Sequence, residues 1–149
     1  VFLDLEVETV ARRNDNEVIP IPGEWQVETR KQLADALGCK TVDWASRYSF
    51  MPDVIVNCTP VGMHPNVDES PLSKTSLKPS MLVFDTVYNP ESTLLIKDAR
   101  DRNCHTATGV DMFEKQAELQ FKLFTKQDAP AGLMREVLKT AIGPIGGRR

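Results

Sequence analysis

The residues best placed to do chemistry follow a short apolar run at residues 54–56. Asn57 and Thr59 offer hydrogen-bonding side chains, and Gly62 allows the backbone to approach a ligand closely. In an open α/β sheet, ligands collect outside the carboxyl ends of the strands. The pattern predicts either a ligand site at residues 57–63 or an ordinary connection after a strand.

Gln116 is a second candidate, because it interrupts the apolar stripe of a helix expected at residues 109–125. At about 100° per residue, one side of that helix collects Met112, Phe113, Gln116, Leu119, Gln120 and Leu123. An amide buried there without partners would cost roughly 1–3 kcal/mol. Gln116 is therefore either a core glutamine bonded to a loop carbonyl or an amide presented to a hydroxylated ligand. Tyr88, at the end of another apolar run, is open to the same two interpretations.

The start of the same helix has the spacing of a capping box. Thr108 and Asp111 stand three residues apart, and Gly109 between them permits a tight turn into the helix. Backbone amides at such a helix start suit a negative or polar group of a ligand. This start is a third place where a ligand could be held.

Apolar runs and helix signals define the elements that must position these residues. Strands are expected at residues 54–56, 81–84 and 104–107, with a strand-like run at 1–10 and an edge strand or loop at 18–22. Helices are expected at residues 29–37, ended by Gly38, from Asn89 to about Arg102, at 109–125 and at 129–141. A short helical turn is expected at 43–46 and a loose tail at 143–149.

Strands that alternate with helices predict an α/β fold with a mainly parallel sheet covered by helices on both faces. In a doubly wound sheet the loops at 57–63, 86–88 and 108–112 would open into one crevice. We expect an irregular or truncated first part at 1–28 and the main part of the domain at 29–142.

Composition limits the classes of partner. The chain has 149 residues, 41% hydrophobic and 26% charged, which is typical of one globular domain. A net charge of -3 argues against nucleic acid or an anionic membrane as the partner, and no apolar run reaches transmembrane length. Three scattered cysteines and two separate histidines predict neither a disulfide framework nor a metal site, so a reducing cytoplasmic setting is expected.

Three motifs together resemble shikimate dehydrogenase in order and spacing. They are Asn57-Cys-Thr-Pro-Val-Gly-Met63, Phe84-Asp-Thr-Val-Tyr88-Asn-Pro90 with Thr93, and Gly109-Val-Asp-Met112 with Gln116. They are similar to the carboxyl-terminal, NADP-binding half of that family, which has a Rossmann-like fold. The sequence of residues 64–71 resembles that of enzymes in which this dehydrogenase is fused behind a type I 3-dehydroquinate dehydratase.

The resemblance implies reversible hydride transfer that links NADPH and 3-dehydroshikimate to NADP and shikimate. It implies that cofactor-binding residues are Asn57, Thr59, Gly62, Met63, Thr86, Gly109 and Met112. Tyr88 and Gln116 match positions that reach the substrate, and Gly109 would leave room for the nicotinamide ring. Hydride transfer requires the two carbons at roughly 3–3.5 Å.

Two parts of the family pattern are missing from the sequence. No G-x-G-x-x-G phosphate loop precedes residue 50, and either Arg12 or Arg13 is the nearest candidate for the NADP 2′-phosphate, if the pair is not simply solvated. The family's catalytic lysine and aspartate belong to an amino-terminal substrate domain, so no catalytic residue is assigned. We therefore expect a cofactor-side portion that is inactive alone.

Two main alternatives stay open from the sequence, besides a Rossmann domain from a different reductase, which would not explain all three motifs. One is a quinate or quinate/shikimate dehydrogenase that uses NAD. The other is a non-catalytic Rossmann-like binding module that has lost its phosphate loop. A preference for NAD over NADP would favour the first alternative. A gene without an upstream substrate domain would favour the second.

Overall fold

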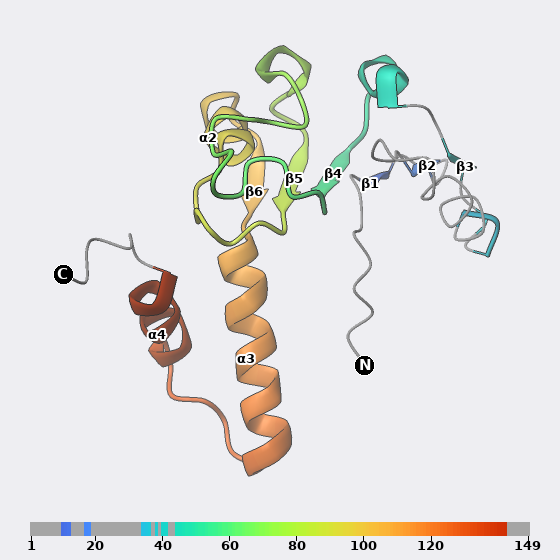
Figure 1. Cartoon of the computed structure of the whole chain (residues 1–149). Coiled ribbons are helices and arrows are strands. Elements are labelled where there is room, and N and C mark those ends of the chain that lie inside the picture. Colours follow the sequence, from blue (N-terminus) through green and yellow to red (C-terminus); the bar gives the residue numbers. More distant parts are fainter. Residues whose placement is uncertain are drawn as a thin grey trace.

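The computed structural model describes residues 10–12, 17–18, 34–36, 38, 40–41 and 44–142. Its main sheet has the strand order β1-β4-β5-β6 (Figure 1). These strands are β1 (Val10–Arg12), β4 (Val54–Asn57), β5 (Leu82–Asp85) and β6 (His105–Ala107). The last three strands are parallel, whereas β1 pairs antiparallel with β4. This arrangement confirms the predicted α/β class with a mainly parallel sheet.

Within residues 44–142, the core lies between one face of the sheet, one helix and the segment at residues 72–77. Ile55 and Val83 alternate with less buried neighbours along β4 and β5, and both point to the buried face. Helix α2 (Leu94–Asp101) packs on β5 and β6 and contributes Leu95 and Ala99 to the same cluster. Leu82, on the alternate face of β5, is 38% exposed. The described part of the chain therefore buries one sheet face more completely than the other.

Helix α2 begins later than the sequence predicts. The expected start at Asn89 is wrong, because Thr93 is the N-cap and its side chain accepts a hydrogen bond from the backbone amide of Ile96. The peptide bond between Asn89 and Pro90 is cis, and the chain bends through residues 89–92 before the helix. The predicted end near Arg102 is confirmed, since Arg102 is the C-cap.

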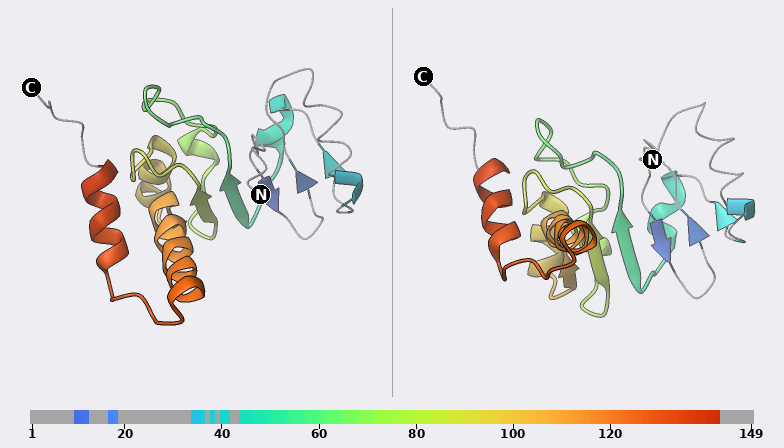
Figure 2. Two further views of the ribbon diagram at one scale, coloured as in Figure 1. Left: turned by 60° about the horizontal axis from the view of Figure 1, so that its bottom comes forward. Right: turned by 90° about the horizontal axis from the view of Figure 1, so that it is seen from below.

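Helix α3 (Gly109–Thr125) has the predicted bounds and the predicted capping box. It starts directly after β6 and leads away from the sheet, with α4 (Leu133–Ile142) beside it (Figure 2). Helix α4 starts later than the expected residue 129, because the chain still turns through residues 131–132. Several apolar side chains on α3 are exposed, among them Leu119, Leu123 and Phe124.

The remaining elements are short. They are the parallel pair β2 (Glu17–Val18) and β3 (Lys40–Thr41), and the 3-10 helices η1 (Trp44–Ser49) and η2 (Lys74–Ser76). Residues 34–36 are helical and Gly38 has a φ of 64°, which agrees with the predicted helix end. The expectations for residues 1–9, 19–33, 37, 43 and 143–149, and for Arg13 as a phosphate-binding candidate, lie outside the described residues. Over the described ranges, none of the helices has the length and apolar character needed to cross a membrane.

Candidate functional site

The carboxyl ends of β4 and β5 are joined by buried polar side chains. Asn57 and Asp85 are paired in register, and the Asn57 Nδ2 donates to Asp85 Oδ1 at 3.0 Å. Both residues are 0% exposed. A buried amide and carboxylate are tolerated only when their hydrogen-bonding capacity is used, so this pair depends on the groups around it.

The remaining atoms of Asn57 shape the loop that follows β4. Its Oδ1 accepts from the backbone amide of Thr59 at 3.0 Å and from the Thr59 hydroxyl at 2.7 Å. Its Nδ2 also donates to the Val61 carbonyl at 3.3 Å, and the Val61 amide donates to the Thr59 hydroxyl at 3.1 Å. The two residues that the sequence offers as ligand-binding groups are thus buried and bonded to their own loop. Their structural role is to hold the turn.

Asp85 is the acceptor at the centre of this network. Its carboxylate accepts from Asn57, from the Thr93 hydroxyl at 2.6 Å and from the Val87 amide at 3.0 Å. Burial raises the pKa of Asp85, and the hydrogen bonds from Thr93, Val87 and Asn57 oppose that rise. Asp85 and Thr93 belong to the second motif, but their type and spacing alone predicted no role for them. A carboxylate at a strand end with a helix-capping threonine eight residues later was the available signal.

The loop residues Gly62 and Met63 differ in their surroundings. Gly62 is buried with a φ of 90°, and a Cβ there would lie 3.1 Å from the Glu69 carbonyl oxygen, so glycine is required. Met63 is 43% exposed. The next residue, His64, donates its backbone amide to the Asn89 carbonyl at 3.3 Å, which joins this loop to the segment after Tyr88. Met63 therefore lies on the surface beside the second loop.

Thr86 and Gly109 bring the third predicted loop to the same place. The backbone amide and the hydroxyl of Thr86 both donate to the Asn57 carbonyl, at 2.9 and 3.0 Å. A Cβ on Gly109 would lie only 2.4 Å from the Thr86 carbonyl oxygen and 2.5 Å from that of Val87. Gly109 thus permits backbone packing of α3 onto the loop after β5. All three predicted loops meet at one edge of the sheet.

Tyr88 and Phe113 form an exposed aromatic pair at this edge. Their ring centroids are 5.7 Å apart and their planes are tilted by 46°. Tyr88 is 43% exposed and Phe113 is 40% exposed, while Met112 is half-buried. Sequence reasoning treated Phe113 only as part of an apolar stripe and missed this contact.

Gln116 lies on the same helix but is exposed. The interpretation of Gln116 as a core glutamine bonded to a loop carbonyl is therefore wrong. The helix itself forms as predicted, but its apolar stripe is largely exposed, because no described element covers that face. The alternative, an amide presented to a ligand, stays a prediction.

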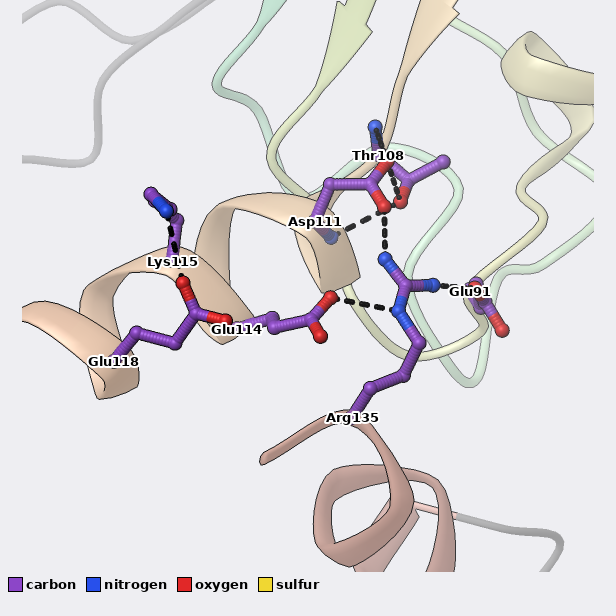
Figure 3. Close-up of polar contacts among 7 residues, drawn as sticks. All are labelled: Glu91, Thr108, Asp111, Glu114, Lys115, Glu118 and Arg135. Carbon is purple, nitrogen blue, oxygen red and sulfur yellow. Dashed lines mark hydrogen bonds and ion pairs between the residues drawn. The ribbon is translucent and has the colours of Figure 1, made fainter. Parts of the chain in front are cut away.

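Arg135 of α4 is a further group that sequence reasoning missed. Its guanidinium contacts three carboxylates, those of Glu91, Asp111 and Glu114 (Figure 3). Asp111 also accepts from the Thr108 amide at 2.9 Å and from the Thr108 hydroxyl at 2.7 Å. Partial burial of Asp111 opposes ionisation, but the hydrogen bonds from Thr108 and Arg135 outweigh it and lower the pKa of that carboxyl. No local sequence pattern predicts ion pairs between residues this far apart.

Other reactive groups give no second site among the described residues. No cluster of three or more His, Cys, Asp or Glu side chains there could hold a metal ion. Cys58 is half-buried beside Asn57, and burial together with the charge of Asp85 raises the pKa of its thiol. A raised thiol pKa disfavours the thiolate, the reactive form of cysteine.

Comparison with known proteins gives a consistent picture. Residues 109–139 match the family model described as shikimate 5'-dehydrogenase C-terminal domain. The shikimate dehydrogenase (NADP(+)) of Bacillus subtilis is 45% identical over 95 residues, which cover 64% of this chain and 33% of that protein. The chloroplastic bifunctional 3-dehydroquinate dehydratase/shikimate dehydrogenase of Arabidopsis thaliana is 39% identical over 114 residues, 74% of this chain and 19% of that protein.

The fold is likewise similar to a solved dehydrogenase. The quinate dehydrogenase from Corynebacterium glutamicum in complex with NAD superposes with a TM-score of 0.70 at 28% identity, over 85% of this chain and 46% of that one. The chain spans no more than about a third of the length of these curated relatives. Family model, sequence relatives and fold agree that the chain is similar to the carboxyl-terminal part of the shikimate dehydrogenases.

Proposed function

We propose that this chain is the cofactor-side portion of an NADP-dependent shikimate dehydrogenase, which interconverts 3-dehydroshikimate and shikimate. The whole activity requires an amino-terminal substrate domain, either as a preceding part of the same polypeptide or within a fused bifunctional enzyme. The chain by itself is expected to bind NADP weakly and to be inactive.

One observation carries the proposal: the three family-like motifs converge at the carboxyl edge of the sheet. Thr86 bonds to the carbonyl of Asn57, and Gly109 packs against the backbone of Thr86. This edge is where open α/β sheets bind dinucleotides. Backbone segments separated by more than fifty positions in the sequence thereby meet at one edge of the sheet.

A nicotinamide ring is flat and needs close, largely apolar neighbours, and exposed side chains at this edge offer them. Met63 and Tyr88 are exposed on adjoining loops, and Phe113 lies against Tyr88. Met63, Thr86, Gly109 and Met112 are the residues proposed to hold the ring end of the cofactor, and Asn57, Thr59 and Gly62 are proposed to support them by shaping the loop. The cofactor, when bound, supplies the hydride acceptor or donor. Tyr88 and Gln116 are proposed to meet hydroxyl groups of the substrate.

Titration of the purified chain with NADPH and with NADH, followed by the fluorescence of the reduced cofactor, tests the binding part. Weak but saturable binding of NADPH is expected, because no glycine-rich phosphate loop stands in the sequence. Met63→Ala is expected to weaken it, whereas Met51→Ala, a methionine of similar exposure outside the three loops, is the matched control. Absence of binding to either cofactor contradicts the proposal. Steady oxidation of shikimate by the chain alone contradicts the expected inactivity.

An NAD-dependent quinate or quinate/shikimate dehydrogenase is the second candidate, favoured by the similarity to the Corynebacterium enzyme. Tighter binding of NADH than of NADPH in the same titration supports this candidate. Assays of the complete polypeptide with quinate and shikimate then separate the two substrates.

A further inference from the structure

The Arg135 guanidinium connects three segments that are separate in the sequence. Its Nε donates to Glu114 Oε2 at 2.7 Å on α3, and its Nη1 donates to Glu91 Oε1 at 3.3 Å in the bend before α2. Its Nη2 donates to Asp111 Oδ1, in the first turn of α3 (Figure 3). Arginine suits this task because its planar fork can serve several oxygens at once, which a lysine ammonium cannot do in the same geometry.

Two partners of Arg135 lie close in sequence to residues of the proposed site. Asp111 stands between Gly109 and Met112 and closes the capping box with Thr108. Glu91 stands three residues after Tyr88. Helix α4 itself contributes no residue to the proposed site. The guanidinium of Arg135 nevertheless holds the start of α3 and the bend after Tyr88 in one arrangement.

We propose that Arg135 is a positioning residue that fixes the first turn of α3 against the segment at residues 88–91 and so keeps the nicotinamide-facing surface assembled. The link from this position of α3 to cofactor binding rests on the function proposed above. The effect is electrostatic as well as geometric. Removal of the guanidinium leaves Glu91, Asp111 and Glu114 facing one another without their common cation, and like charges at short range repel.

The experiment compares the chain with the variants Arg135→Met, Arg135→Lys and Lys139→Met. Lys139 is an exposed cation on the same helix, so its substitution controls for the loss of one charge from α4. Two measurements are made on each: the dissociation constant for NADPH, and amide hydrogen exchange without cofactor. Exchange is followed in residues 109–112 and 86–91, with β4 and β5 as internal references.

Arg135→Met is expected to raise the dissociation constant about tenfold, equivalent to 1.4 kcal/mol, while Lys139→Met leaves it unchanged. Faster exchange is expected in the two segments but not in the reference strands. Arg135→Lys is expected to restore part of both effects. Added salt should reduce the defect of Arg135→Met relative to the unsubstituted chain, because salt screens the exposed carboxylates. Mere loss of side-chain packing would not respond to salt in this way.

Failure of this inference is distinguishable from failure of the proposed function. If the unsubstituted chain binds neither NADPH nor NADH, the proposed function fails, and the exchange measurement alone decides the role of Arg135. Unchanged exchange in residues 109–112 and 86–91 overturns the positioning role. Faster exchange with an unchanged dissociation constant also overturns the inference, because the site would then not depend on this arrangement.

Discussion

The hydroxyl of Thr93 donates a hydrogen bond of 2.6 Å to the carboxylate of Asp85, and both groups are buried. The same hydroxyl accepts from the amide of Ile96 and caps α2. One atom therefore connects the helix that covers the core with the strand end that supports the proposed site. Both helix α2 and the strand end beneath the proposed site therefore depend on the Thr93 hydroxyl.

Thr93→Val should lower the free energy of unfolding by about 2–3 kcal/mol, because it removes a helix cap and a hydrogen bond to a buried carboxylate. Valine preserves the shape of the side chain, so the loss isolates the hydroxyl. Urea denaturation measures it. Thr140→Val, an exposed threonine of α4, should cost far less. Equal losses in the two variants would contradict the role given to Thr93.

Asp85 should make the chain less stable as the pH rises. Burial raises its pKa in the folded state above the ordinary value of 3.8, so the folded state retains a proton that the unfolded state has lost. The stabilisation is complete below the unfolded pKa and is lost as the pH rises through the folded pKa. The stability advantage of the unsubstituted chain over Asp85→Asn should therefore shrink as the pH rises from below 3.8 through the pKa of the folded state.

Asp111 should have the opposite pH dependence. Its pKa in the folded state is lowered below 3.8, so its stabilisation is present above that value and is lost as the pH falls through the folded pKa. The stability difference between the chain and Asp111→Asn should thus be larger near neutral pH than in acid. Urea denaturation of both variants over the same pH series checks the two signs together. Slopes of the same sign would disprove one of the two assignments.

Gly109→Ala should be more damaging than its position at a helix start suggests. The added methyl would overlap the carbonyl oxygens of Thr86 and Val87, and backbone atoms cannot move aside as a flexible side chain can. We expect a loss of about 3 kcal/mol, at the upper end of overpacking costs. Gly132→Ala is the matched control: its Cβ would meet open space, and its φ of 76° should cost only about 1–2 kcal/mol.

Local signals predicted α3 well, whereas α2 shows their limit. The threonine–aspartate spacing at Thr108 and Asp111 places both ends of a capping box within one turn, so it is legible in the sequence. Before α2, Asn89 and Pro90 offered a similar signal, but the cap belongs to Thr93, which also has a tertiary partner in Asp85. A preference for a helix start is weak, and a buried hydrogen bond overrides it.

Residue type and spacing identified the candidate site residues, but they did not predict which of these residues are buried. Asn57 and Thr59 bond to their own loop, and Gln116 is exposed although its helical stripe is apolar. Periodicity tells which residues share a face and not whether another element covers that face. Arg135 could not be found at all, because its carboxylate partners meet it only after the chain has folded.

The pairing of Asn57 with Asp85 also determines which alignment of β4 and β5 is acceptable. A slip of one residue would turn the amide to the opposite face of the sheet, and a slip of two would place it across from apolar Val83. In either case the buried carboxylate would lose one of its donors, at a cost comparable to that of an unmade hydrogen bond. Two apolar strands by themselves would tolerate such slips more readily. The polar pair therefore penalises misalignment during folding, before any ligand is present.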